Sequence, residues 1–586
     1  MTTAPTVAAT QPRVRAAAAV SADTVAVGVL FLLSGAVALL AWGTWGDIAS
    51  DTGYDLVAGA RVASGEVPYL DFVYYYGPLA PALLGLTALL GGSGLGPAVA
   101  LGLVTTGGII GATYALARRF SSPVGAFLAA ALTAGVALEP TNFSFVLPHS
   151  STATLALLCA LGFLLALARG HMSLAGACVG LVTLTRPEFA LAVAAGFVVW
   201  IMARARGGAL TRSELVRLVV PALAIPGVVY GVLLAVVGPH QLIFENLYPV
   251  EELRQGGDAI LGAYAPFTLA SFSAVSLKLA SYAAGTALLI GLAGGVVRAG
   301  RLWGGVFSAA VVIAAVTAAT AEPEALRSGL YLVYGWIPAG AAAAFAVLAV
   351  RAWRDRERSP AAHLELAALA VLLVLAAKTY ANFMFHAAPH AQLAVYAAPF
   401  AALFLVRVHV RGRRPVLAAG VLWLGFLAAA GFGLTLKDAR AESASVAGPQ
   451  GTLQATPSEA ATYNAVLDWI DSGTRPGDPV LIAPQLTSLY TLSGRTDPLD
   501  RISLLPGALS DPADERAAIT QLERSGVRIA VIDKRPFTEY GGHTSFGDSF
   551  DRLVAKWLHR HFVLAHTYRS GDPTPRPVEI WVRRSS

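Results

Sequence analysis

Long apolar runs separated by short polar segments make up the chain as far as residue 436. A run of about 20 apolar residues is long enough to cross the hydrocarbon core of a bilayer as a helix. The pattern therefore predicts about 13 transmembrane helices. They are expected at residues 24–43, 97–117, 122–138, 150–168, 172–186, 188–203, 215–237, 278–297, 302–321, 328–350, 363–380, 389–408 and 415–436.

A further apolar run at residues 78–92 is too short for the same interpretation. About 15 residues at roughly 1.5 Å each extend over about 22 Å, which is less than the roughly 30 Å of the hydrocarbon core. Counting this run as a span would also place Arg118 and Arg119 outside. We therefore predict that it forms a helix lying along the outer membrane surface.

Positive charges follow the alternation of the predicted helices, with 19 Lys and Arg residues in inner segments and six in outer segments before residue 437. The inner ones are Arg13, Arg15, Arg118, Arg119, Arg169, Arg204, Arg206, Arg212, Arg217, Arg298, Arg301, Arg351, Arg354, Arg356, Arg358, Arg407, Arg411, Arg413 and Arg414, and the outer ones are Arg61, Arg186, Arg254, Lys278, Arg327 and Lys378. The positive-inside rule then places the N-terminus in the cytoplasm. We expect a multi-pass protein of the plasma membrane with everything after Lys437 outside.

The segment after Lys437 has a different pattern, in which short β-branched runs alternate with capped helices. Thr456-Pro457-Ser458-Glu459 is a capping box that begins a helix to about Ser472. Further helices are expected from Asp511 to about Arg524 and at 546–561, and strands at 479–485, 527–534, 561–568 and 578–584. We predict a cytoplasmic tail (1–23), a membrane domain (24–436) and an extracytoplasmic α/β domain (437–586).

Composition agrees with this mostly α-helical, polytopic organisation. Of the 586 residues, 55% are hydrophobic and 13% are charged, whereas soluble domains carry about 25% charged residues. The net charge of +6 is spread over the loops, so we expect a lipid bilayer and no nucleic acid as a partner. Cys159 and Cys178 lie in apolar runs and are interpreted as packing residues.

The first loop, residues 44–96, contains the most concentrated chemistry in the chain. Its acids are Asp47, Asp51, Asp55, Glu66 and Asp71, against a single cation, Arg61. Clustered carboxylates beside a bilayer are costly unless they face water, a metal or a substrate. If residues 51–64 form a helix, Asp51 and Asp55 share one face. The loop is the leading functional site, and an acidic, solvated loop with an interfacial tyrosine belt is the simpler alternative.

Here the chain resembles a family. The first membrane helix is followed by a loop with an early aspartate, by the turn Gly65-x-x-Pro68-Tyr69-x-Asp71-Phe72, and by Tyr76-Gly77-Pro78 at the start of an apolar helix. This resembles the GT-C glycosyltransferases, in particular the branch of protein mannosyltransferases, aminoarabinose transferases and RgtA/B/C/D-like enzymes. The resemblance implies a GT-C-like fold and the use of polyprenyl-phosphate sugars outside the membrane. It also matches Asp51 to the catalytic aspartate and Asp71 to the acid before the apolar helix.

The chain departs from the better-known branches at two positions. Thr52 stands where those enzymes often have a second acid after the first aspartate. Tyr76-Gly77-Pro78 stands where they have His-Pro-Pro or Lys-Pro-Pro. The resemblance therefore transfers neither their metal dependence nor their donor contacts, and the cofactor stays open, a divalent cation being one option.

The chemistry of glycosyl transfer indicates which other residues to examine. A sugar hydroxyl needs a positioned base, and a departing lipid phosphate needs cations, a metal or hydrogen-bond donors. The candidate substrate-binding residues are Asp55, Tyr76, Glu139, His149, Arg186, Glu188, Lys378, His386 and His390. For Arg186 the simpler alternative is an ion pair with Glu188 or with an acid of the loop, and for each histidine it is a hydrogen-bonded packing role. Pro389 interrupts the helix face that two histidine ligands would share, so no zinc site is predicted.

The sequence thus favours transfer of a sugar from a polyprenyl-phosphate donor to an envelope glycan, lipid or protein on the outer face, with Asp51 as general base and Asp71 assisting. A secondary transporter or flippase is the alternative, because the helix break at 185–188 is typical of such proteins. An inactive scaffold with the same fold is a third possibility. The C-terminal domain has no catalytic triad or metal spacing and is expected to support the site or bind the acceptor.

Overall fold

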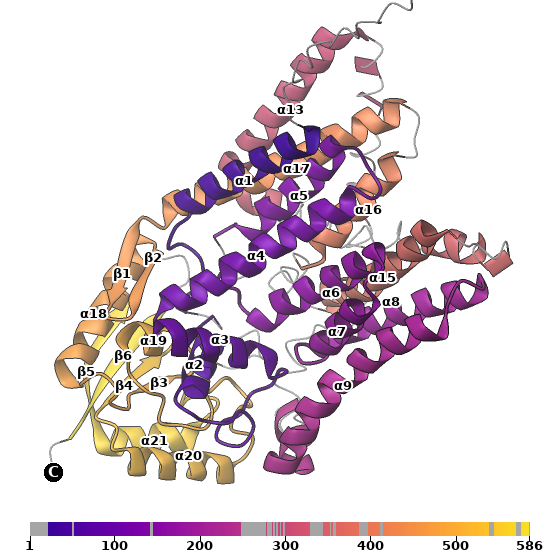
Figure 1. The fold of residues 1–586 in the computed structure, drawn as a ribbon. Helices are drawn as coiled ribbons and strands as arrows, with labels where there is room; N and C mark the ends of the chain where they lie inside the picture. Colours follow the sequence, from indigo (N-terminus) through magenta and orange to yellow (C-terminus); the bar gives the residue numbers. More distant parts are fainter. Residues whose placement is uncertain are drawn as a thin grey trace, which may run out of the picture.

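The protein is mostly α-helical, with a bundle of long helices and an α/β region at one end of it (Figure 1). The computed structural model describes residues 21–49, 52–140, 144–247, 301–327, 344–351, 353–354, 359–385, 396–410, 414–537, 544–569 and 576–584, with isolated positions between 273 and 300. Within these residues, seven helices are long and apolar enough to cross a membrane. The mostly α fold class with a C-terminal α/β region is confirmed.

The helices of the bundle coincide with predicted apolar runs. They are α1 (Ala22–Leu40), α4 (Leu95–Ala117), α5 (Pro123–Ala137), α6 (Ser151–Arg169), α7 (Met172–Val182), α8 (Pro187–Arg206), α9 (Arg212–Val237), α13 (Arg301–Ala321), α15 (Pro360–Phe385), α16 (Ala398–Val410) and α17 (Arg414–Ala441). The runs at 278–297 and 328–350 fall largely outside the described residues, so the total of about 13 stays a prediction.

Local sequence explains where several of these helices begin and pack. The Ser122 side chain accepts a hydrogen bond at the start of α5, and Thr211 and Glu214 form a capping box at the start of α9. Small residues let α5 and α17 approach closely: a Cβ added to Gly431 would lie 3.1 Å from the carbonyl carbon of Gly135.

Two short helices of the first loop lie between the bundle and the α/β region. They are α2 (Thr52–Ala63) and α3 (Leu79–Gly91), and they pack against each other. A Cβ on Gly59 would lie 2.5 Å from the Cβ of Leu84, so the close approach requires glycine. The helix considered for 51–64 is present from Thr52 to Ala63, and the helix predicted at 78–92 is confirmed from Leu79 to Gly91, while the position of α3 along a membrane surface stays a prediction.

In the part that the structure describes, the C-terminal α/β region contains a hairpin, a four-stranded sheet and four helices. The hairpin consists of β1 (Ala444–Gly448) and β2 (Gly451–Ala455). The sheet has the strand order β3 (Leu481–Ala483), β4 (Ile529–Asp533), β6 (Pro577–Arg583) and β5 (Phe562–Arg569). The helices are α18 (Pro457–Gly473), α19 (Ser488–Ser493), α20 (Pro512–Ser525) and α21 (Arg552–His561). β3 and β4 are parallel and the other sheet pairs are antiparallel. The helix predicted at 546–561 begins at Arg552 instead, because Asp551 has a positive φ of 50° that cannot continue a helix.

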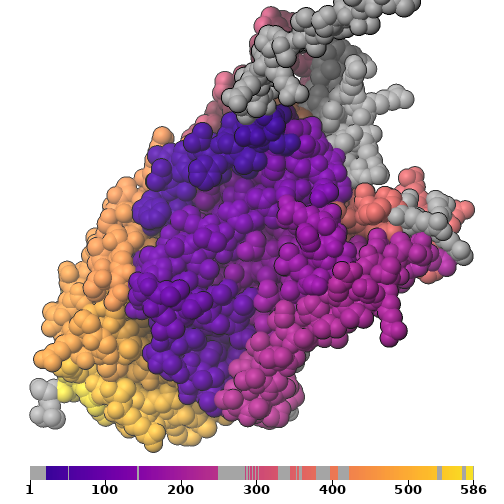
Figure 2. All heavy atoms as spheres, in the orientation of Figure 1, coloured from indigo at the N-terminus to yellow at the C-terminus, as the bar shows by residue number. Residues whose placement is uncertain are grey.

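The α/β region rests on the first loop, as its orange-to-yellow surface against the indigo one shows (Figure 2). The Val73 amide donates to the Asp500 carbonyl at 2.8 Å, and Arg61 Nη1 donates to the Leu499 carbonyl at 2.6 Å. α19 lies against α2, and a Cβ on Gly53 would come within 2.0 Å of the Ser488 amide nitrogen. The first loop is thus enclosed between the bundle and the α/β region.

Candidate functional site

A polar cavity of about 310 Å³ opens where the first loop, the ends of the bundle helices and the α/β region meet. We call it the acid-lined cavity. Its lining residues are Gly46, Asp47, Ile48, Pro140, Arg327, Asp438, Glu442, Gln454, Ala455, Glu459 and Tyr463. Four of these are carboxylates and one is an arginine, so the cavity attracts cationic or hydroxyl-bearing groups and repels anions.

Arg327 forms the base of this cavity and is shared by three acids. Its Nε lies 2.7 Å from Glu139 Oε1 and its Nη2 lies 2.5 Å from Asp438 Oδ2, while its Nη1 pairs with Glu324. Glu139 is 3% exposed, and burial raises its pKa to about 7 against the lowering effect of Arg327. The predicted substrate-binding residue Glu139 is therefore engaged in an ion pair beside the cavity.

Glu442 follows α17 and contributes a second perturbed carboxyl group to the cavity. Burial raises its pKa to about 9, and the neighbouring acids Asp438, Asp47 and Glu459 add to the effect. Its Oε2 atom is buried without a hydrogen-bond partner among the described residues. Sequence reasoning missed Glu442 and Glu459 as site residues, because Glu442 follows a helix without any motif, Glu459 was interpreted only as a helix cap, and both come near Asp47 only through the fold.

The turn at Asp47 is the part of the first loop nearest this cavity. Asp47 Oδ1 accepts the Ala49 amide at 2.7 Å, and the Asp47 amide donates to Thr52 Oγ1 at 3.2 Å. The predicted general base Asp51 lies outside the described residues. Of the described residues around it, Gly46, Asp47 and Ile48 line the acid-lined cavity, while Thr52 lies behind them and accepts the hydrogen bond from the Asp47 amide.

A cation and an aromatic ring form a second feature, the Arg186–Tyr76 cluster. The Arg186 guanidinium lies 4.6 Å from the centre of the Tyr76 ring, and its Nε is 3.0 Å from Glu188 Oε1. Its side chain is 11% exposed. The ion pair between Arg186 and Glu188 that we considered as the simpler alternative is therefore present, together with the ring contact.

The absence of a side chain at Gly77 allows the segment that carries Tyr76 to pack closely against the segment that carries Arg186. The Gly77 amide donates to the Thr185 carbonyl at 2.7 Å, in the break between α7 and α8. A Cβ on Gly77 would lie 2.3 Å from the carbonyl oxygen of Leu184. The Tyr-Gly-Pro segment that starts α3 therefore packs directly on the helix break, and this brings Tyr76 to Arg186.

Asp55 joins the first loop to α6. Its Oδ1 accepts the Tyr74 hydroxyl at 2.7 Å and its Oδ2 accepts the Ser151 amide at 2.6 Å. It is 2% exposed, and burial raises its pKa. Asp55 thus accepts a hydrogen bond from an amide at the α6 N-terminus that has no partner within the helix. Half-buried His149 lies two residues before that amide in the chain, and its electrostatic interaction with Asp55 lowers the pKa of Asp55 slightly.

The other predicted site residues lie apart from these features or outside the described chain. Asp71 is exposed, and its Oδ2 accepts the Val67 amide at 2.7 Å, which closes a turn. His386 and His390 lie outside the described residues, and Lys378 belongs to α15 without a described side chain. Among the described residues, no group of three or more His, Cys, Asp or Glu side chains is arranged to hold a metal ion.

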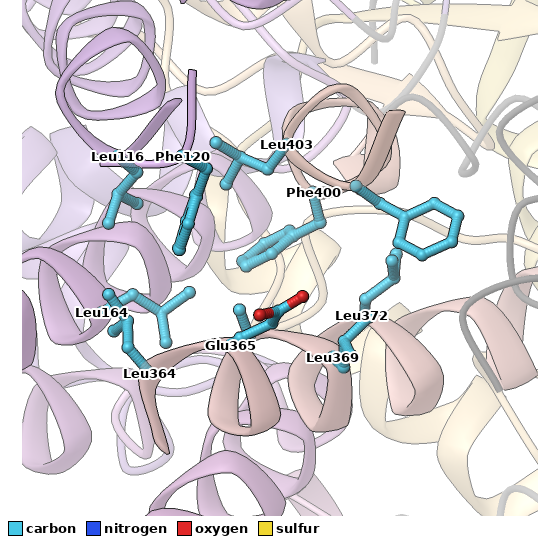
Figure 3. Close-up of a pocket in the computed structure, with 11 residues that line it drawn as sticks. Leu116, Phe120, Leu164, Leu364, Glu365, Leu369, Leu372, Phe400 and Leu403 are labelled. Atoms are coloured by element: carbon cyan, nitrogen blue, oxygen red, sulfur yellow. The ribbon is translucent and has the colours of Figure 1, made fainter. Parts of the chain in front are cut away.

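A smaller cavity lies inside the bundle, among α4, α6, α15 and α16 (Figure 3). Its volume is about 40 Å³, and its lining is apolar apart from Glu365, whose carboxyl group points into it. It is lined by Leu116, Phe120, Leu164, Leu364, Glu365, Ala368, Leu369, Leu372, Phe400, Leu403 and Phe404. The space is enough for about one water molecule, so we treat this cavity as part of the core.

Comparison with known proteins finds a likeness only among solved structures. No protein-family model and no curated protein matches the chain. ArnT from Cupriavidus metallidurans bound to undecaprenyl phosphate is 15% identical, with 94% of this chain and 97% of that chain covered and a TM-score of 0.47. The apo state of the same enzyme is 16% identical, with 95% and 98% covered and a TM-score of 0.37. Likeness at this level carries no statement about the reaction or substrate of this chain.

Proposed function

We propose that this protein transfers a sugar from a polyprenyl-phosphate carrier to an acceptor on the outer face of the membrane. The observation that supports it best is the position of the first loop. One side of that loop borders the cationic Arg186–Tyr76 cluster, and another borders the acid-lined cavity. The anionic leaving group of such a transfer needs cationic surroundings, and the hydroxyl-bearing acceptor needs hydrogen-bond acceptors such as carboxylates.

The Arg186–Tyr76 cluster suits the donor phosphate. Arg186 is the residue immediately before α8, so its guanidinium lies where the positive end of the helix dipole also favours an anion. Arginine binds phosphate through two parallel hydrogen bonds. Tyrosine is frequent at the headgroup level of a membrane, which is where the phosphate of a lipid carrier would lie.

The acid-lined cavity suits an acceptor sugar. Its volume of about 310 Å³ is at the lower end of the roughly 300–1,000 Å³ of small-molecule sites. Carboxylates accept hydrogen bonds from sugar hydroxyls, and their charge excludes the phosphate of the donor. We propose an envelope glycan, a lipid or a protein as the acceptor.

The reaction requires one base between these two regions. The acceptor hydroxyl attacks the anomeric carbon, its proton passes to a carboxylate, and the bond between that carbon and the phosphate oxygen breaks, releasing the lipid phosphate. We assign the base to Asp51, through the resemblance and its place two residues after Ala49, and an orienting or metal-binding role to Asp71. Asp55 is less suited, because its carboxylate already accepts two hydrogen bonds.

Turnover by the purified full-length protein in lipid nanodiscs tests the proposal. It is supplied with undecaprenyl-phosphate-linked hexoses and pentoses and with envelope extract as acceptor, and released undecaprenyl phosphate is measured. Release that depends on Asp51 supports the proposal. Movement of intact lipid-linked sugar across the bilayer without cleavage would favour the flippase alternative, which the observed break between α7 and α8 also suits. Mass spectrometry of envelope glycans from a deletion strain then identifies the sugar.

A further inference from the structure

We propose that Arg576, in the C-terminal α/β region, is a positioning residue that holds the first loop immediately before Ser50 and Asp51. Its Nη2 donates to the Ala49 carbonyl at 3.0 Å. These two residues are 527 positions apart in the chain. The kinetic part of this inference rests on the proposed sugar transfer, whereas its structural part does not.

The guanidinium is held in place by the sheet. Arg576 Nε and Nη2 lie 2.8 and 2.6 Å from Asp533 Oδ2, and Nη2 also lies 3.0 Å from Gln485 Oε1. Asp533 is the last residue of β4 and is fully buried, and Arg576 directly precedes β6, which pairs with β4. Because Asp533 pairs with Val578 in β6 and Arg576 lies two residues before Val578, the strand pairing brings the two side chains together.

The loop end of this contact is fixed as well. The Ala49 amide donates to Asp47 Oδ1, so that both polar backbone groups of Ala49 are bonded. Ser488 Oγ donates to the Asp47 carbonyl at 3.1 Å, and Gly53 packs on the Ser488 backbone. The α/β region therefore holds the described residues on both sides of the 50–51 segment, and Arg576 is its charged contact there.

Such a contact matters because a general base must lie within hydrogen-bond reach of the proton that it accepts. A displacement of about 1 Å can lower turnover by roughly 100-fold. The proposed donor contact at Arg186 reaches the loop at Tyr76, which is far along the chain from Ala49. Loss of the bond from Arg576 should therefore lower kcat and leave the KM for the donor nearly unchanged.

Arg576→Lys is the sharpest variant. A lysine keeps a positive charge for Asp533 but has a single ammonium in place of the fork that also reaches Gln485 and Ala49. Arg495→Lys is the matched control, because Arg495 is 6% exposed and its hydrogen bonds to Thr474 and Ser493 remain within the α/β region. Both variants are made in the full-length protein in nanodiscs.

Two measurements test the inference. Hydrogen–deuterium exchange followed by mass spectrometry should show amides of residues 44–53 exchanging on the order of tenfold faster in Arg576→Lys, and unchanged in Arg495→Lys. Undecaprenyl phosphate release from the undecaprenyl-phosphate sugar that wild type uses best should show kcat lower by roughly 10- to 100-fold, with KM within about twofold.

Unchanged exchange in Arg576→Lys would overturn the inference, and so would an equal increase in Arg495→Lys, which would reveal a general loosening of the α/β region. Faster exchange with wild-type kcat would also refute a positioning role. If wild type itself releases no undecaprenyl phosphate from any of the sugars, the proposed function fails, and the exchange measurement alone decides whether Arg576 holds the loop.

Discussion

Asp55 belongs to the first loop and Arg186 contacts that loop, but their surroundings give the two side chains different roles. The carboxylate of Asp55 accepts hydrogen bonds from Tyr74 and Ser151 and is buried. The guanidinium of Arg186 pairs with Glu188 and lies over the Tyr76 ring, and it also interacts electrostatically with Tyr396 and Asp55. Five N–H groups in a planar fork leave Arg186 with capacity to bind a phosphate.

Arg186→Gln should weaken binding of undecaprenyl phosphate. A hydrogen bond to a charged group contributes about 1.5–3 kcal/mol, so the dissociation constant should rise by roughly 10- to 100-fold. Arg204→Gln is the control, because Arg204 lies near the other end of the same helix and pairs with Glu214 at 2.8 Å. Equilibrium binding to the protein in nanodiscs measures both. Equal affinity of Arg186→Gln and wild type would remove Arg186 from the donor site.

Asp51→Asn should lower turnover by about 10²–10⁴-fold, the usual contribution of a general base, while donor binding persists. Asp55→Asn should cost far less turnover but lower the melting temperature, because the amide offers only one acceptor oxygen to the two buried donors Tyr74 and Ser151. Steady-state rates and thermal melting distinguish the two. A collapse of turnover in Asp47→Asn, with Asp51→Asn close to wild type, would move the base to Asp47.

Glu442 should make the folded protein less stable as the pH rises. Its pKa of about 9 in the folded protein lies above the ordinary value of 4.5, so its contribution to folding stability is fully present below pH 4.5 and is lost as pH rises toward 9. Glu442→Gln should therefore be more stable than wild type at pH 9 by about 1–2 kcal/mol after discounting for solvent screening. Thermal unfolding from pH 5 to 9 checks this, and parallel curves for both proteins would contradict it.

At the scale of elements, the decisive arrangement is the packing of the first-loop segments on their neighbours. α2 packs on α3 and α19, and the Tyr-Gly-Pro segment packs on the break between α7 and α8. These contacts are backbone to backbone at several points, so they depend on glycines more than on particular side chains.

Gly77→Ala should disturb the helix break and the Arg186–Tyr76 cluster together. The new Cβ would lie 2.3 Å from the Leu184 carbonyl, so the segment must move and destabilise the fold by about 1–3 kcal/mol. Donor affinity should fall with the melting temperature. Gly107→Ala in α4 is the matched control, because a Cβ there meets nothing within 4 Å. A Gly77→Ala protein with both properties intact would show that the close packing is not needed.

At the scale of the whole molecule, the site lies between a helical bundle and an α/β region, and its use depends on which side of the membrane that region occupies. The charge alternation predicts the outer side. A labelling experiment can therefore test the orientation independently of any activity.

Cysteines introduced at Ser472 and Ser213 should react differently with a membrane-impermeant maleimide in intact cells. Ser472 lies in α18 of the α/β region and Ser213 lies at the start of α9, and both are exposed. Ser472→Cys should be labelled and Ser213→Cys should not, until the cells are permeabilised. The wild-type protein, with its native Cys159, which is partly buried, and Cys178, which is buried, gives the background. The reverse pattern would invert the topology.

Much of the secondary structure followed from the sequence, because its causes are local. The length of an apolar run determines whether a helix can cross a bilayer, and Thr456 with Glu459 marks a helix start through bonds within one turn. The helix at 51–64 and the strands of the α/β region were predicted for the same reason. The β1–β2 hairpin was not, because its Ala, Ser and Gly residues carry little strand signal.

The composition of the site was decided only by tertiary structure. Asp47, Glu442 and Glu459 line one cavity, although nearly the whole bundle separates Asp47 from the other two acids in the sequence. Glu139 pairs with Arg327, 188 positions away in the chain, and Arg576 bonds to Ala49, 527 positions away. No periodicity or motif encodes such pairs, since they depend on how helices cross and how the sheet seats on the first loop. The acids of that loop therefore marked the region from sequence alone, while packing determined which of them bind partners and which line the cavity.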